Sequence, residues 1–328
     1  MIRLIYTFTL VLFSALTIAS EGFVFNSVEL ALEHKDEVKI LNLSNQKLTK
    51  IPEAIIEMTQ LEELNISGNM ISDLPASFSA LKNLKILTLG DPLSVHGGNQ
   101  FNRIPKAVFE LSSLESLMLS RNQVQVVSKD IAKLSSLRSL YLNENQIKRL
   151  PKEIGELKKL QALFLGKNAL VSLPESIGHL KSLKTLDVKQ NFLEDIPSSI
   201  HNLKNLRSLE VQENQISSFA IDLVRLANLQ SLILSGNPLK TFDLKSSEES
   251  LLAMLVINGT RLKSIPDELS KCLNLRVLDI SENNLKTFDY RLVQDSPKLL
   301  YLWIGGNKIS EDEIELIKKK CKRITLKS

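Results

Sequence analysis

Two carboxylates, Asp187 and Glu210, come closer than any other residues of this sequence to a catalytic acid–base pair. They lie 23 residues apart, which is one period of the repeat described below, so we expect them on adjacent strands of one sheet face. Paired carboxylates act as acid and base when burial or a like charge separates their pKa values. Nothing in the sequence indicates that they are buried, and we therefore predict no catalytic residue.

The other reactive side chains are too few and too scattered for catalysis or metal binding. The chain has two cysteines and four histidines, and it contains no GxSxG, HExxH or glycine-rich phosphate-binding motif. Two cysteines make neither a disulfide framework nor a four-ligand zinc site. The sequence thus predicts a protein without enzymatic activity, cofactor, metal ion or small-molecule substrate.

The composition indicates a folded, globular chain. Of 328 residues, 43% are apolar and 24% are charged, which is enough apolar sequence for a sizeable core. The 41 Lys and Arg against 37 Asp and Glu leave a net charge of +4, which is too small to indicate a nucleic-acid partner.

Residues 1–20 have the pattern of a secretory signal peptide. Arg3 precedes an apolar run of fifteen residues, and Thr17 and Ala19 supply the small residues of a cleavage site. A membrane span needs about 20 residues, so an uncleaved anchor is the less favoured alternative. Because no cysteine stands at the cleavage site, we expect a protein that is secreted, periplasmic or on the cell surface. It is not expected to be a lipoprotein or to contact the membrane beyond its signal peptide.

From Val38 onward the chain repeats with a period of 23 residues. The pattern is LxxLxLxxNxLxxLPxxIxxLxx, and it is clearest in the copies that begin at Leu137, Leu160 and Leu183. Twelve copies fit after one insertion of seven residues, a register that chance does not produce. The repeats predict a solenoid over 38–310.

Each part of the repeat has a structural role. The LxL segment alternates apolar and polar residues, so stacked copies predict a parallel sheet on the concave side. The Asn that follows is placed to pair backbone groups that the turning chain would otherwise leave unsatisfied. Gln46 and Thr260 replace it in two copies, where we expect this ladder of Asn side chains to weaken. The Leu-Pro pair and the apolar residues after it predict short helical turns on the convex side.

The two ends of the solenoid need caps because no neighbouring repeat covers them. One cap helix is predicted within 21–37 and another within 311–328, where acidic residues come early and lysines late, as the helix dipole prefers. The predicted fold class is therefore α/β. It is a curved right-handed horseshoe with a parallel β-sheet inside, short helical or 3-10 turns outside, and helical caps at both ends.

These repeats resemble those of leucine-rich repeat proteins, and EVKILNLSNQKLTKIPEAI resembles the first repeat of short bacterial members of the Leptospira type. The resemblance covers 24–328 and implies a leucine-rich repeat solenoid that acts as an exported or surface binding protein, in some members toward host matrix or receptor proteins. The lack of cysteine-rich end caps favours a bacterial source. Uneven curvature is expected at the insertion, at the polar stretch 245–250, and where other residues replace the Leu-Pro pair: Val127, Phe219, Phe242 and Phe288.

The concave sheet is the extended surface that such a solenoid offers to a partner. The residue between the two inward apolar positions of each strand points to this face, and aromatic residues and Met are enriched in interface cores. We predict a protein-binding strip of six such residues on successive strands: Met118, Tyr141, Phe164, Asp187, Glu210 and Ile233. Incidental stacking of the apolar members, and mere cross-strand pairing of the charges, are the alternatives.

Two other features are left open by the sequence. Ile233, Val256 and Trp303 form a second apolar group, in which Trp303 either contacts a partner or packs against the C-terminal helix. The insertion over 90–101 predicts a protruding turn whose Asp91 and His96 could contact a partner, or an inert insertion.

We therefore expect an exported, non-enzymatic scaffold that binds a host surface or matrix protein, or an envelope protein, through its concave face. A self-associating periplasmic or envelope scaffold, and so a homo-oligomer, is the first alternative. An intracellular repeat regulator is the second, if the N-terminus is not a cleaved signal.

Overall fold

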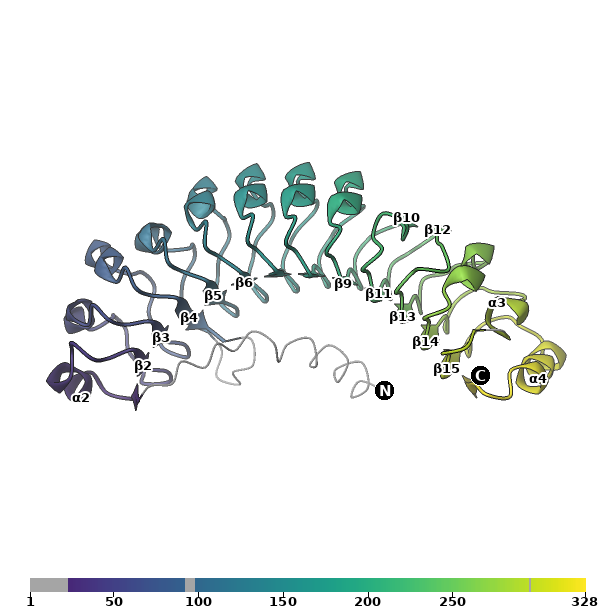
Figure 1. Cartoon of the computed structure of the whole chain (residues 1–328), viewed down its shortest axis with the longest axis horizontal. Coiled ribbons are helices and arrows are strands. Elements are labelled where there is room, and N and C mark those ends of the chain that lie inside the picture. Colours follow the sequence, from purple (N-terminus) through teal and green to yellow (C-terminus); the bar gives the residue numbers. More distant parts are fainter. Residues whose placement is uncertain (1–22, 92–97, 295) are drawn as a thin grey trace.

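The computed structural model describes residues 23–91, 98–294 and 296–328, which form one curved solenoid (Figure 1). Its concave side is a parallel sheet that contains 14 strands in the described part of the chain. In spatial order these are β1 (Val24–Phe25), β2 (Ile40–Asn42), β3 (Glu63–Asn65), β4 (Ile86–Gly90), β5 (Ser116–Leu119), β6 (Ser139–Tyr141), β7 (Ala162–Phe164), β8 (Thr185–Asp187), β9 (Ser208–Glu210), β11 (Ser231–Ile233), β13 (Met254–Val256), β14 (Val277–Asp279), β15 (Tyr301–Trp303) and β16 (Thr325–Lys327).

The strand register follows the repeat. Leu140 pairs with Leu163, and Leu163 pairs with Leu186, so equivalent positions stack along the whole sheet. The leucines that point away from the concave side, such as Leu140 and Leu142, are fully buried and belong to one continuous core. The predicted horseshoe with an inner parallel sheet is confirmed.

The Asn residues after the strands form the predicted ladder. The Asn191 amide donates to the carbonyls of Leu165 and Val188, both at 3.0 Å, and its Oδ1 accepts the Leu170 N–H at 2.9 Å. The same bonds to the preceding repeat recur from Asn69 to Asn307.

Thr260 keeps only part of the ladder. Its hydroxyl lies 2.9 Å from the Ile257 carbonyl of its own repeat and 2.8 Å from Asn283 Oδ1 of the next. Among the described residues it has no bond back to the Leu234 carbonyl of the preceding repeat, where an Asn would reach. The ladder is therefore interrupted there, as the sequence predicts.

The convex side is built mostly from 3-10 turns. Pro fixes φ near −65° and lacks an N–H, so it suits the position just before each turn. Pro174 is one example, with φ of −70°, and the turn that follows it buries Ile177. The turns are η1 (Glu53–Glu57), η2 (Ala76–Ala80), η3 (Lys106–Glu110), η4 (Lys129–Lys133), η5 (Lys152–Glu156), η6 (Glu175–His179), η7 (Ser198–Asn202) and η8 (Asp267–Lys271).

Two consecutive repeats depart from this pattern. Where most other repeats form helical turns, the chain forms β10 (Ser218–Asp222) and β12 (Thr241–Lys245), which pair in parallel as a separate sheet between η7 and η8 (Figure 1). Phe219 and Phe242 replace Leu-Pro, and their inward rings stack with centroids 6.4 Å apart. The Leu-Pro pair that predicts a helical turn is absent from these two repeats, and two stacked β-formers without Pro favour strand pairing.

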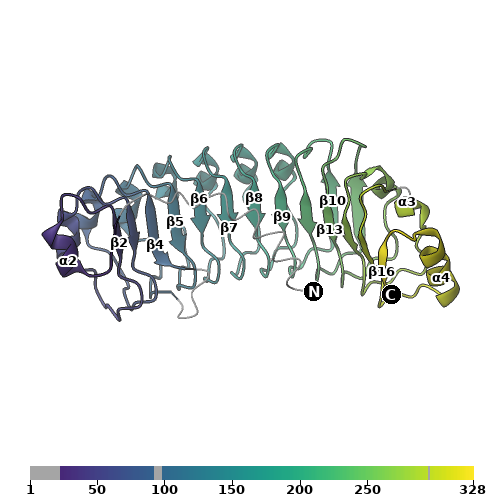
Figure 2. The same ribbon diagram turned by 60° about the horizontal axis from the view of Figure 1, so that its bottom comes forward.

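Helices lie at both ends of the solenoid (Figure 2). The Ser27 side chain accepts the Leu30 N–H at the start of α2 (Val28–Glu33), and the Ser310 side chain accepts the Glu313 N–H in α4 (Glu311–Lys320). A short helix, α3 (Arg291–Gln294), precedes β15. The last helix is shorter than the predicted cap segment 311–328, because the chain after Cys321 returns to the sheet as β16.

The described residues include no helix that is both long enough and apolar enough to cross a bilayer. The predicted signal peptide, 1–20, lies outside the described residues. In the insertion, Gly90 and Gly98 form an antiparallel bridge and Asn99 resumes the ladder, while 92–97 also lie outside the described residues.

Candidate functional site

The structure brings the six predicted strip residues together on six neighbouring strands. Direct cross-strand pairs run without a break from β5 to β11 along the concave side: Met118, Tyr141, Phe164, Asp187, Glu210 and Ile233. The uniform register of the repeat places them in one row, because a shift of one residue would turn each side chain to the core.

Two aromatic rings form the centre of the row. The Tyr141 and Phe164 rings stack with centroids 4.7 Å apart and an angle of 12° between their planes. Ala162 and the half-buried Met118 pack against them. Tyr141 is only 8% exposed and Phe164 6% exposed, so the rings are less accessible than an open sheet face suggests. Burial also raises the pKa of the Tyr141 hydroxyl, although a hydrogen bond with Ser139 opposes this shift.

A charged cluster follows directly on the next two strands. Lys189 Nζ lies 3.0 Å from Asp187 Oδ2 and 3.1 Å from Glu210 Oε2, and the Lys189 N–H donates to Asp187 Oδ1. The side chains of Asp187 and Glu210 are 3% and 8% exposed. The premise that nothing buries these carboxylates is therefore wrong, because neighbouring repeats enclose them.

Burial, and then the adjacent Glu210 carboxylate, raise the pKa of Asp187 to about 6, although Lys189 opposes this shift. Burial lowers the pKa of Lys189, but the two carboxylates outweigh that effect and raise it overall. Shifted pKa values occur both at active sites and in structural ion-pair networks. Here one lysine holds both carboxylates, which is the geometry of an ion-pair network.

Gly166 makes room for the Asp187 carboxylate, a role that the sequence analysis missed. A Cβ at this position would lie 3.1 Å from Asp187 Oδ1 and 3.2 Å from Oδ2, closer than most such contacts. Gly166 stands two residues after Phe164 on the same face of its strand. A glycine at a position that is polar or charged in the neighbouring repeats was the available signal.

A second apolar group lies toward the C-terminal end of the concave side. It is larger than predicted and includes Ile233, Met254, Val256, Val277 and Trp303, with Tyr301 packed against them. Three members were not predicted from the sequence: Met254, Val277 and Tyr301. Met254 and Tyr301 stand two residues before the predicted Val256 and Trp303, and Val277 pairs with Met254 and Tyr301 on the adjacent strands, so all three share that face.

Trp303 belongs to this concave group and not to the packing of the C-terminal helix. Its ring centroid lies 6.2 Å from that of Tyr301, and Lys327 Nζ of β16 lies 5.7 Å from the ring. The indole Nε1 is buried and has no hydrogen-bond partner among residues 23–91, 98–294 and 296–328. Ile233 packs with this second apolar group. Asp187 and Glu210 therefore lie between Ile233 and the stacked rings of Tyr141 and Phe164.

The structure describes one of the two residues predicted in the insertion. Asp91 is half-buried directly after β4, and His96 lies outside the described residues.

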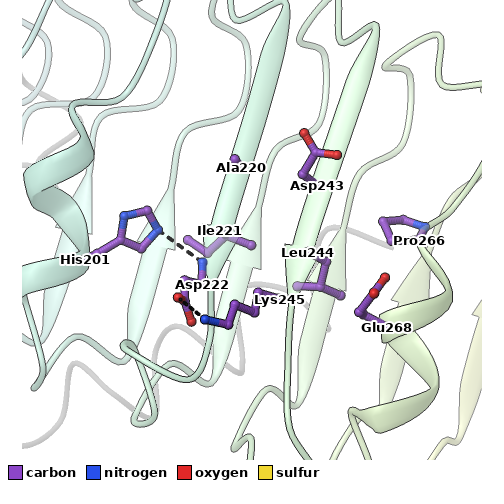
Figure 3. A pocket seen from close by; sticks show the side chains of 9 residues that line it. All are labelled: His201, Ala220, Ile221, Asp222, Asp243, Leu244, Lys245, Pro266 and Glu268. Atoms are coloured by element: carbon purple, nitrogen blue, oxygen red, sulfur yellow. Dashed lines mark hydrogen bonds and ion pairs between the residues drawn. The ribbon is translucent and has the colours of Figure 1, made fainter.

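A cavity of about 350 Å³ lies on the convex side, next to β10 and β12 (Figure 3). His201 Nε2 accepts the Asp222 N–H at 3.1 Å, and Lys245 Nζ lies 3.3 Å from Asp222 Oδ2. Pro266 and Glu268 line its other side. The sequence analysis did not predict this cavity, which lies where two repeats lack a helical turn.

Family comparison agrees with this architecture. A model described as a leucine-rich repeat region matches residues 119–265, and a leucine rich repeat model matches 36–91 and 250–309. Together the matches cover most of the solenoid. The chain belongs to the leucine-rich repeat proteins.

Individual relatives show how widely the fold is shared. The chain is 24% identical to a leucine-rich repeat protein of Leptospira interrogans, with a TM-score of 0.50, and the alignment covers 94% of this chain and all of that one. The ectodomain of the plant receptor kinase GASSHO1/SCHENGEN3 from Arabidopsis thaliana, in complex with Casparian strip integrity factor 2, is 23% identical. Its TM-score is 0.66, and the alignment covers 92% of this chain and 39% of that one.

One curated relative matches a short segment. The volume-regulated anion channel subunit LRRC8D of Rattus norvegicus is 32% identical over 97 residues, which is 29% of this chain and 10% of the subunit. The match therefore spans about a tenth of that protein.

Proposed function

We propose that this protein is an exported, non-enzymatic scaffold that binds a protein partner through its concave face. The observation that carries the proposal is the unbroken row from Met118 to Glu210, in which stacked rings adjoin a charged cluster. In the described part of the chain, no second layer covers this side of the sheet (Figure 1). Aromatic anchors edged by charge are typical of protein interfaces.

The similar structures support the general role. The plant ectodomain that shares the fold was solved in complex with a factor that it binds. For this chain, the partner class we propose is a host surface or matrix protein, or an envelope protein. Export rests on the signal-like pattern of residues 1–20, and Asp91 and His96 of the insertion are proposed as a secondary contact.

The test is a pull-down from host extracellular extracts and from bacterial envelope extracts. The wild-type chain is compared with a Tyr141→Ala, Phe164→Ala double variant, and each melting curve is recorded to show that the variant folds. Phe192→Ala is the matched control, because Phe192 is 51% exposed and stands outside the row. A partner retained by wild type and control but lost by the double variant is the expected result. Equal retention by all three chains would place binding elsewhere.

Self-association is a second candidate, favoured by the last strand of the sheet. β16 pairs with β15 alone, so its other edge is free of strand partners in the described structure. Unpaired edges are templates for pairing with another chain. Sedimentation at increasing concentration tests this candidate, since a scaffold of this kind forms concentration-dependent oligomers and a monomeric receptor does not.

A further inference from the structure

We propose that the concave face recognises an arginine side chain of its protein partner, and that Glu210 and its neighbours on β9 receive the guanidinium group. The inference rests on the proposed binding function and names the chemistry of the contact. Its elements are an unbalanced charge, a row of unpaired acceptors and an aromatic ring nearby.

The charge comes from two carboxylates that share one lysine. Asp187 is fully engaged, since Lys189 contacts it through both Nζ and the backbone N–H, and Gly166 lets it lie against the sheet. Glu210 is engaged through Oε2, which accepts from Lys189 Nζ at 3.1 Å and from Gln212 Nε2 at 3.4 Å. Its Oε1 has no hydrogen-bond partner among the described residues. The cluster therefore keeps one unpaired negative charge, centred on Glu210.

The acceptors lie on both sides of Glu210 along the chain. Ser208 Oγ and Gln212 Oε1 are buried and have no hydrogen-bond partner in the part of the chain that the structure describes, and Ser208 is 1% exposed. Ser208 and Glu210 stand two apart on β9 and so share the concave face, and Gln212, two residues after the strand ends, lies beside Glu210 because its Nε2 donates to Glu210 Oε2. Buried acceptors without partners are costly, and a ligand that brings N–H donors removes this cost.

An arginine fits this row better than a lysine. The guanidinium group is planar, carries five N–H donors and stays charged, so it can reach Glu210 and a neighbouring acceptor at the same time. A lysine ammonium brings a compact charge that is more strongly hydrated. Phe164 lies two strands from Glu210 with Asp187 between them, and an aromatic ring favours an adjacent cation or the apolar stem of its side chain.

The test begins with the protein, purified in the form that the cell produces. Phage-displayed random peptides are then selected for binding to it. The best peptide is then synthesised with arginine, lysine or citrulline at its conserved basic position, because citrulline has nearly the shape of arginine but no charge. Affinities are measured for the wild type, Glu210→Gln, Ser208→Ala and the Tyr141→Ala, Phe164→Ala double variant. Glu213→Gln is the matched control, since Glu213 is an exposed carboxylate on the same repeat that pairs with Gln190.

We expect selected peptides to contain arginine and to lose at least tenfold in affinity with citrulline or with Glu210→Gln, and several-fold with lysine or Ser208→Ala. Glu213→Gln should change affinity by less than twofold. Peptides that require Tyr141 and Phe164 but lack arginine, or that bind Glu210→Gln unchanged, would overturn the inference and leave the proposed function standing. Peptides that bind independently of Tyr141 and Phe164 would count against both.

Discussion

The convex side contains two kinds of repeat, and their difference shows what decides the outer layer. After β7 and β8 the chain passes Pro174 and Pro197 and forms the 3-10 turns η6 and η7. After β9 and β11 it passes Phe219 and Phe242 and forms the paired strands β10 and β12. All four repeats have the same length and the same inner strand. The residues at the entry to the outer layer therefore select its structure.

Two intermediate repeats refine this rule. Val127 precedes η4, where Ser128 Oγ replaces proline by accepting the Asp130 N–H at 3.2 Å. Phe288 precedes α3, where Asp289 Oδ1 accepts the Arg291 N–H at 2.9 Å. Loss of Leu-Pro alone does not abolish helical structure, because a capping side chain compensates. The two adjacent Phe repeats instead form strands directly after Phe219 and Phe242, and in the first of them a capping side chain comes only at the strand end, where Asp222 Oδ1 accepts the Val224 and Arg225 N–H groups.

The largest effect that we expect is a loss of stability on mutation of a ladder residue, and it should be greater in a regular repeat than at Thr260, where the ladder is interrupted. Asn191→Ala leaves the Leu170 N–H without its acceptor and removes one of the two amide donors of the Leu165 and Val188 carbonyls, which keep Asn168 and Asn214. Because it breaks a buried hydrogen-bond network, it should lower the free energy of unfolding by about 3–5 kcal/mol. Thr260→Val removes fewer bonds and should cost about 1–2 kcal/mol. Urea denaturation followed by circular dichroism measures both. Equal losses would show that the ladder is no weaker at Thr260.

The stacked phenylalanines should hold the paired strands together. Phe242→Ala removes a buried ring that contacts Phe219 and should lower the free energy of unfolding by about 3–4 kcal/mol. Phe242→Leu, which restores the residue of the regular repeats, should cost less than about 1.5 kcal/mol. Thermal unfolding of the two variants checks the difference. A cost below about 1 kcal/mol for the alanine variant would mean that backbone pairing alone keeps β10 and β12 together.

Asp187, which lies in a regular repeat, should make the free energy of unfolding depend on pH. Since burial and Glu210 raise its pKa to about 6 in the folded chain, the folded state binds this proton more tightly than the unfolded state. The stability that Asp187 contributes is therefore full below about pH 4 and is lost as the pH rises through about 6.

A shift of this size corresponds to at most about 3 kcal/mol. Urea denaturation of the wild type and Asp187→Asn over pH 4–7 measures it, and parallel curves would contradict it. Burial also raises the pKa of Asp279, although hydrogen bonds from Ser281 oppose this shift. Asp279→Asn is therefore the comparison from the C-terminal repeats.

The smallest expected effect repairs the interrupted ladder. Thr260→Asn supplies an amide that can donate to the Leu234 carbonyl, as Asn does in the regular repeats. It also supplies an oxygen that can accept the Leu239 N–H, in place of the Asn237 carbonyl that now accepts it at 2.9 Å. The free energy of unfolding should rise by about 1 kcal/mol. Hydrogen exchange at Leu239 should slow in this variant. An unchanged exchange rate would show that the local backbone does not adopt the ladder geometry.

The sequence predicts the features that depend on the repeat alone. The strand register and the Asn ladder follow from the 23-residue period, because each equivalent residue meets the same neighbours. The row from Met118 to Ile233 follows in the same way. The missed members of the second apolar group, Met254 and Val277, obey the same alternation and could have been found from it.

Features that depend on differences between adjacent repeats were not predictable from the pattern. The burial of Asp187 depends on Gly166 in one neighbouring repeat and on Glu210 in the other. The β10–β12 pair likewise needs two consecutive repeats with Phe, since a single Phe at 288 is followed by a helix. Such effects depend on the particular residues of two adjacent repeats, which the consensus pattern of the 23-residue repeat does not contain.

The uniform register also has a genetic consequence. Because neighbouring repeats have the same length and pair through equivalent residues, an unequal exchange between their coding segments can remove one whole repeat and leave a continuous sheet. Loss of the repeat that carries Phe164 would bring Tyr141 directly beside Asp187. The gene can therefore change the order of side chains on the concave face by recombination, without a point mutation and without a new fold.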